Sequence, residues 1–275
     1  MKQTPGKIVI FGQYKSGTTA LFSKIHNSLP ATTRTLFEPL TYVQDAKDAE
    51  RWVLAKTILK FPGHPEPVDY ETFLAFDRKV YLTRDPRDWL VSATLFLAQE
   101  KPSIYSDAAA QAFVMDYLRA KEQNPRGAPL KTLLEFIQQA PPVLSLAYFC
   151  QRTQGLHEWC FEFENRLQDY TWVKYEDFID GRIQNLIDYL EIPLYGDAQV
   201  ADRYQHVVRS KSYGSWRHWL TAEDIDFFQP FFQPYIERYN YPANWDLSEN
   251  PKIDPQHSSE YVARVIDMKR KKMNS

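Results

Sequence analysis

The feature that most constrains this chain is a loop with two glycines, GQYKSGTT at residues 12–19. It follows a short β-rich run at 7–11, typical of a buried parallel strand, and opens into a helical pattern at 18–29. Glycine lets the backbone turn tightly, and the first turn of a helix points amide groups at an anion. The sequence therefore predicts a phosphate-binding loop at this junction.

The place of the lysine within this loop argues against a nucleoside triphosphate. A triphosphate loop has the pattern G-x-x-x-x-G-K-S/T, with lysine directly after the second glycine. Here that position is Thr18, and the lysine has moved inside the loop to Lys15. Such a lysine would lie beside one phosphate and its leaving bond rather than reach a metal-bound triphosphate. A structural turn with ordinary capping threonines is the alternative interpretation.

Strands alternate with helices along the rest of the chain. Further strands are expected at 35–37, 53–59, 79–83 and 170–174, and helical patterns at 86–96, 108–167 (interrupted at 125–127 and 141–142), 183–190 and 221–235. This alternation predicts an α/β fold of three layers, with a central, mostly parallel five-stranded sheet flanked by helices. We expect residues 1–275 to form a single domain, in which about 246–275 make an extended arm and a C-terminal helix or tail.

Composition excludes several classes of function. With 33 basic and 35 acidic residues the net charge is −2, so no general binding of nucleic acid is expected. The two cysteines form no disulfide framework, and the six histidines show no paired ligand spacing, so no metal is expected. No secretory signal and no apolar run of about 18 residues is found, which predicts no transmembrane segment and a cytoplasmic protein.

Two further segments could bind anions. The first, RDPRDWLVS at 84–92, begins at the carboxyl end of a predicted strand, where ligands of open α/β sheets gather. Arg84 and Ser92 are eight residues apart, so a guanidinium and a hydroxyl could hold one phosphate. Arg87 and Asp88 are expected to be a solvated pair. The second segment, RSKSYGSWR at 209–217, is a predicted loop before the helix capped by Thr221.

These segments resemble the sulfotransferases that use 3′-phosphoadenosine 5′-phosphosulfate (PAPS). Residues 15–19 look like the 5′-phosphosulfate loop of that family, and 84–92 look like its 3′-phosphate segment. Residues 209–216 match its R-x-x-x-x-G-x-W cofactor loop, and YED at 175–177 is similar to another recurring signature. All four occur in the family's order between residues 7 and 220. The resemblance implies a P-loop-containing, sulfotransferase-like fold, PAPS as donor and the bisphosphate PAP as its product.

The resemblance also implies a role for each matching position. Lys15 would contact the bridging oxygen of the donor, and Tyr175 would lie near the adenine. The remaining positions would bind the two phosphates: Ser16, Gly17, Thr18 and Thr19 the 5′-phosphate, and Arg84, Ser92 and Arg209 the 3′-phosphate, with Ser210 and Lys211 as further candidates. Three positions depart from the family: Tyr14 replaces a proline, Ala20 replaces a tryptophan that often stacks on the adenine, and Lys211 replaces a glycine.

Sulfuryl transfer needs a base for the acceptor proton, and two residues are candidates. Glu38, in LFEPL at 36–40, follows the second predicted strand and resembles the F/Y-E-P segment of carbohydrate-type sulfotransferases. His64 follows the third predicted strand, near the place of the catalytic histidine of small-molecule members, but it lacks their K-T-H context. We favour Glu38 and keep His64 as the alternative.

The sequence thus predicts transfer of a sulfuryl group from PAPS to a hydroxyl or amine of a small-molecule, lipid or carbohydrate acceptor. Two alternatives stay open: a P-loop nucleotide kinase-like phosphotransferase, and a module that binds PAPS or PAP without catalysis. The sequence specifies neither the acceptor nor the oligomeric state.

Overall fold

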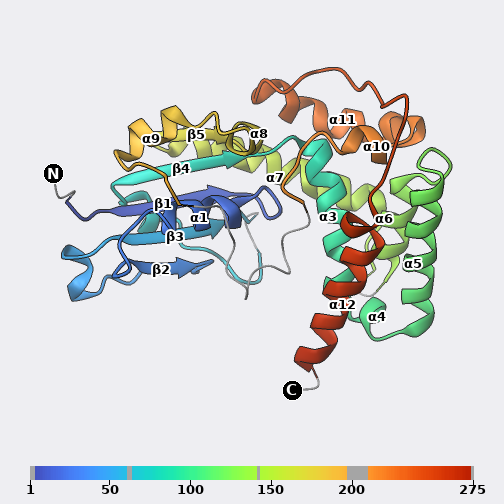
Figure 1. The fold of residues 1–275 in the computed structure, drawn as a ribbon, viewed down its shortest axis with the longest axis horizontal. Coiled ribbons are helices and arrows are strands. Elements are labelled where there is room, and N and C mark those ends of the chain that lie inside the picture. The colour runs from blue at the N-terminus through green and yellow to red at the C-terminus, as the bar shows by residue number, and fades with distance from the viewer. Residues whose placement is uncertain (1–3, 61–63, 141–142, 197–209, 274–275) are drawn as a thin grey trace. The chain divides into compact units, whose positions relative to one another are not determined.

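A computed structural model describes residues 4–60, 64–140, 143–196 and 210–273 of the chain. These residues form two compact units (Figure 1). The first contains the described residues of 1–84 and 155–201, and the second those of 85–154 and 202–275. Helix α7 (Leu146–Arg166) runs from the second unit into the first. The single domain expected from the sequence stays a prediction.

The first unit is built on a five-stranded sheet in which every pair of neighbouring strands is parallel. The strand order is β2-β3-β1-β4-β5. Their bounds are β1 (Lys7–Gly12), β2 (Arg34–Phe37), β3 (Val53–Ile58), β4 (Arg78–Thr83) and β5 (Tyr170–Lys174). Central strand β1 is apolar and buried from Ile8 to Phe11, as expected of a strand covered on both faces. The predicted five-stranded parallel sheet is confirmed.

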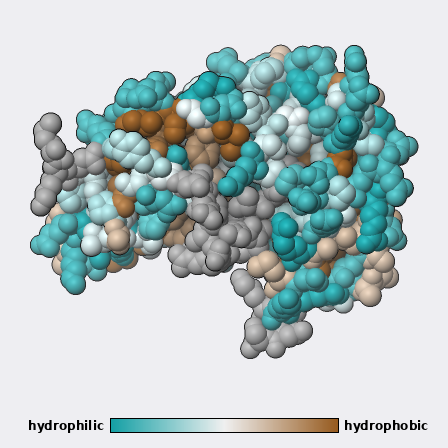
Figure 2. Space-filling model, in the orientation of Figure 1, coloured by the Kyte–Doolittle hydropathy of each residue, from teal (hydrophilic) through white to brown (hydrophobic). Residues whose placement is uncertain are grey.

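Helices cover both faces of this sheet. Alternate strand residues such as Ile10 and Leu82 pack with α1 (Thr18–His26), α8 (Tyr175–Ile179) and α9 (Gln184–Leu190) in one hydrophobic cluster. Figure 2 shows hydrophobic side chains reaching the surface over the α8–α9 region. On the opposite face, Phe11 lies edge-on to Phe163 of α7, with ring centroids 5.0 Å apart. The predicted three layers are therefore present.

The described part of the second unit is helical. Its elements are α3 (Pro86–Glu100), α4 (Pro102–Tyr105), α5 (Ala108–Gln123), α6 (Leu130–Gln139), α10 (Trp216–Trp219), α11 (Ala222–Arg238) and α12 (Ser259–Met273). Helix α3 contacts α4, α6, α10, α11 and α12, which explains why most of its side chains are buried. The predicted cap of α11 is confirmed, since Thr221 and Asp224 form a reciprocal capping box. Within the described residues, no helix is both long and apolar enough to cross a bilayer.

Candidate functional site

The phosphate loop (residues 12–19) joins β1 to α1, as predicted. Lys15 and Gly17 adopt left-handed backbone conformations, with φ of 62° and 98°. Such reversals curl successive amide groups toward one side, which forms an anion-binding concavity. The Ser16 hydroxyl donates to the Gln13 carbonyl at 2.6 Å and holds the turn. The loop therefore has a backbone shape compatible with an anion, and its binding of phosphate stays a prediction.

Arg84 and Tyr175 lie against this loop. Nη1 of Arg84 donates to the Lys15 carbonyl at 3.0 Å, and the guanidinium lies 4.5 Å from the centre of the Tyr175 ring. A Cβ at Gly17 would come within 2.3 Å of the same ring, so only glycine fits there. The structure thus gathers four of the predicted residues where β1, β4 and β5 end. Tyr175 is buried, and its implied contact with the adenine stays a prediction.

An ion pair with a buried lysine joins Glu38 to the phosphate loop. Nζ of Lys56 lies 2.6 Å from Oε1 of Glu38 and 3.0 Å from Oγ1 of Thr19. The Lys56 side chain is 1% exposed, whereas that of Glu38 is 48% exposed. Burial lowers the pKa of Lys56, and the nearby Glu38 charge acts against that shift. One ammonium group therefore links the first turn of α1 to a carboxylate that water can reach.

The backbone explains how this arrangement forms. Lys56 is paired with Ile10 in the sheet register, so its side chain lies on the face that α1 covers. Glu38 directly follows β2, and its amide donates to the Lys56 carbonyl at 2.8 Å. Its φ of 54° is unusual for a residue with a side chain and costs on the order of 1 kcal/mol or more. Lys56 is a residue that sequence reasoning missed; the signal was a lysine within a mostly apolar strand.

His64, the other candidate base, contacts Glu66 within its own turn. Its Nδ1 accepts from the Glu66 amide at 3.0 Å and lies 3.2 Å from the Glu66 carbonyl. The contacts that link a candidate base to the phosphate loop are those of Glu38. The choice of base stays a prediction, and these contacts favour Glu38.

The predicted 3′-phosphate residues are spread over both units. Arg84 belongs to the first unit, whereas Ser92 is buried on α3 of the second. Arg209 lies outside the described residues. Ser210 and Lys211 precede α10, and Lys211 is exposed. Their joint role in binding a 3′-phosphate stays a prediction.

The expectation of a solvated pair at Arg87 and Asp88 is wrong, because both side chains are buried. Arg87 forms an ion pair with Asp85 at 2.6 Å and donates to the carbonyls of Asn244 at 2.5 Å and Pro242 at 3.0 Å. Its guanidinium also lies 4.2 Å from the centre of the Trp216 ring. Protein groups thus replace water around Arg87. Asp88 accepts hydrogen bonds from the backbone amides of Gly214 and Trp216.

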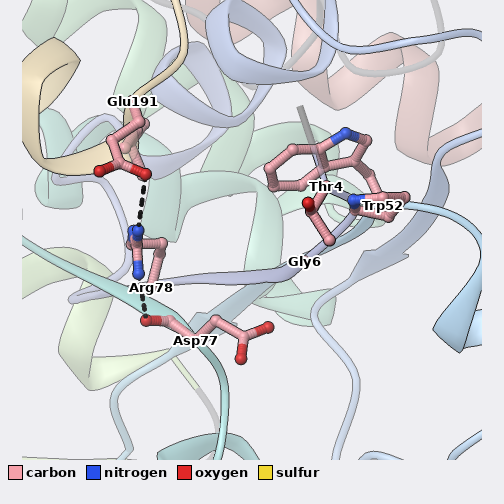
Figure 3. Close-up of a pocket in the computed structure, with 8 residues that line it drawn as sticks. Thr4, Gly6, Trp52, Asp77, Arg78 and Glu191 are labelled. Carbon is pink, nitrogen blue, oxygen red and sulfur yellow. Dashed lines mark hydrogen bonds and ion pairs between the residues drawn. The ribbon is translucent and has the colours of Figure 1, made fainter. Parts of the chain in front are cut away.

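A pocket of about 350 Å³ lies at the end of the sheet where the strands begin, away from the phosphate loop. Figure 3 shows the residues that line it. Most of its lining residues lie at or near the starts of β1, β3 and β4. They are Thr4, Pro5, Gly6, Trp52, Asp77, Arg78, Leu190 and Glu191. Arg78 pairs with Glu191 at 3.1 Å, and Asp77 accepts from the Lys7 amide at 2.7 Å. Because ligands of parallel sheets bind at the carboxyl ends of strands, this pocket is not the candidate site.

The two cysteines and His157 are buried side chains that stay uncharged. Burial raises the pKa of Cys150 and of Cys160 to about 12, so both thiols stay protonated. Burial lowers the pKa of His157 to about 3, which keeps its ring neutral. The part of the chain that the structure describes holds no group of three or more side chains suited to a metal.

No protein-family model matches this sequence, and no curated protein matches it. Solved structures do show similarity. Mouse sulfotransferase SULT7A1 complexed with PAP is 15% identical over 87% of this chain and 90% of that chain, with a TM-score of 0.48. Retinol dehydratase in complex with androsterone and inactive cofactor PAP is 13% identical over 86% and 82%, with a TM-score of 0.44. Both TM-scores are below 0.5, so the functional proposal rests on the residues of this chain.

Proposed function

We propose that this chain is a sulfotransferase that moves the sulfuryl group of PAPS to a hydroxyl or amine of a small-molecule, lipid or carbohydrate acceptor. The observation that carries the proposal is the contact chain from Glu38 through Lys56 to Thr19. It joins an accessible carboxylate to a phosphate loop whose lysine lies within the loop. A base and an anion site in contact are what this chemistry requires.

The residues present fit the donor. The turn at Lys15 and Gly17 suits a single phosphate, and Arg84 reinforces it by binding the loop backbone. Thr18 occupies the position where a triphosphate loop carries its lysine, which disfavours ATP. PAPS supplies the sulfuryl group and a 5′-phosphate that takes up the leaving charge.

The chain's own groups would then divide the work. The Lys15 ammonium and the amides at the start of α1 would hold negative charge at the leaving oxygen. The Glu38 carboxylate would take the proton of the acceptor, since nearly half of its side-chain surface is open to solvent. Lys56 would keep that carboxylate in place, because its ammonium also bonds to Thr19.

Binding of nucleotides separates this proposal from the kinase alternative. We expect PAP to raise the melting temperature of the protein, and ATP with Mg²⁺ to leave it unchanged. A ligand at about one hundred times its dissociation constant stabilises the folded state by about 3 kcal/mol, which a melting curve resolves easily. Stabilisation by ATP–Mg²⁺ and not by PAP would overturn the proposal in favour of a phosphotransferase.

Transfer of radiolabelled sulfate tests catalysis itself. Sugars, phenols, lipids and amines are incubated with labelled PAPS and the protein, and labelled products are separated. Product with one class of acceptor is the expected result. Binding of PAP without transfer to any acceptor class would instead support the module that binds the nucleotide without catalysis.

A further inference from the structure

The carboxylate of Asp88 is buried in the second unit and binds the backbone of the loop at residues 210–216. Its Oδ2 accepts from the Gly214 amide at 2.5 Å. Its Oδ1 accepts from the Trp216 amide at 3.1 Å and from the Ser215 hydroxyl at 3.0 Å. Asp88 is only 1% exposed, so its charge is stabilised by these donors rather than by water.

These bonds determine the path of the loop. Gly214 has a φ of 76°, which reverses the chain just before the short helix α10. The amides at the start of a helix have no partner within it, and Asp88 supplies one for Trp216. The Trp216 ring is in turn packed against the Arg87 guanidinium. Two neighbouring residues of α3 therefore hold one end of the loop.

The same helix carries a predicted phosphate ligand. Ser92 follows Asp88 by four residues on α3, and residues at this spacing share one helical face. Asp88 therefore ties residues 214–216 to the face of α3 that carries Ser92. Ser210 and Lys211, the other candidates in this unit, belong to the loop that is held there.

We propose that Asp88 is a positioning residue for recognition of the donor's 3′-phosphate. This inference rests on the proposed function. Asp88 touches no ligand in this role; it holds the 210–216 loop beside the face of α3 that carries Ser92. It therefore determines how strongly the protein prefers a nucleotide with a 3′-phosphate over one without it.

The test compares PAP with 5′-AMP, which share the adenosine and the 5′-phosphate and differ in the 3′-phosphate. Dissociation constants of both are measured by calorimetry for the wild type and for Asp88→Asn. The amide group of asparagine faces the loop amides as a donor, so at least one hydrogen bond is lost. We expect PAP to bind about tenfold more weakly and 5′-AMP to bind as before.

Asp224→Asn is the matched control. Asp224 is also buried in the second unit and accepts from the amides of Leu130 and Lys131 at 2.8 Å and of Thr221 at 2.9 Å. Its loss should lower the melting temperature and leave the ratio of the two dissociation constants at the wild-type value. Ser215→Ala removes a single hydrogen bond to Asp88 and is the second variant if Asp88→Asn does not fold. It should lower the ratio of the 5′-AMP dissociation constant to the PAP dissociation constant by about twofold.

The outcomes separate the two proposals. If the wild type prefers PAP and Asp88→Asn keeps the full preference, or loses affinity for both nucleotides alike, the role of Asp88 is overturned. If the wild type itself shows no preference for PAP over 5′-AMP, the proposed function is overturned.

Discussion

The phosphate loop and the 210–216 loop both contain a glycine at positive φ, but charged side chains serve them differently. Beside the phosphate loop, Lys56 of β3 contacts the side chains of Thr19, Glu38 and Phe37. Arg84 donates to the Lys15 carbonyl of the loop itself. In the 210–216 loop, Asp88 binds the amides themselves. The protein thus binds the phosphate loop through a backbone carbonyl, whereas it binds the 210–216 loop through backbone amides.

The second unit holds further charged side chains that bind the protein backbone. In the second unit, buried cations bind carbonyl groups of distant segments, as Arg87 does at Pro242 and Asn244. Arg126, which is half-buried, does the same with the carbonyls of Leu220, Arg217 and Ser248. Substitutions around the phosphate loop should therefore change activity more than stability, and substitutions of these buried charges should do the reverse.

The largest effect is expected at Glu38. Glu38→Gln removes the base but keeps the shape of the side chain, so turnover should fall by about 10²–10⁴-fold. Affinity for PAP should change little, because the amide oxygen of glutamine can still accept the hydrogen bond from Nζ of Lys56. Initial rates with labelled PAPS and calorimetry with PAP measure the two quantities.

His64→Gln is the control for this prediction. The proposed function assigns the acceptor proton to Glu38, so loss of His64 should leave turnover near the wild-type value. Near-normal activity of Glu38→Gln together with an inactive His64→Gln would exchange the two assignments.

A second prediction concerns Arg87. Arg87→Met leaves the carboxylate of Asp85 buried without its ion pair, which should destabilise the protein by about 3–5 kcal/mol in urea unfolding. Arg119→Met removes an ion pair whose side chains are 60% and 75% exposed, and should cost under about 1 kcal/mol. Equal losses in the two variants would mean that burial of the Arg87 ion pair adds nothing to the free energy of unfolding.

The sequence predicted the sheet well because parallel strands buried on both faces appear as short apolar runs. The phosphate loop and the cap at Thr221 were found because both depend on residues close together in the chain. The position of Arg84 was predictable as well, since the carboxyl ends of parallel strands meet at one edge of the sheet.

Buried charges were the part that the sequence could not reveal. Asp88 binds residues 214–216, more than 120 positions later, and Arg87 binds carbonyls more than 150 positions later. Spacing along a helix shows which residues share a face, but it does not show what that face meets. A charged pair on a first helical turn therefore looks solvated until its distant partners are known.

The smallest expected effect is a pH dependence of stability caused by Lys121. Like Arg87, this buried cation binds backbone carbonyls of the second unit. Its Nζ donates to the carbonyls of Pro125 and Ala128. Burial lowers the pKa of Lys121 to about 8, and the charge of Asp224 acts in the opposite direction. In the unfolded chain the pKa is near its ordinary value of about 10.5.

Between these two pKa values the unfolded state binds a proton that the folded state lacks, so stability should rise with pH and level off above the unfolded pKa. The free energy of unfolding in urea, taken as wild type minus Lys121→Met, should therefore increase by about 1–2 kcal/mol from pH 8 to pH 9.5. A difference that stays constant across this range would mean that Lys121 keeps its proton in the folded protein, and that the carbonyls of Pro125 and Ala128 hold it as an ammonium ion.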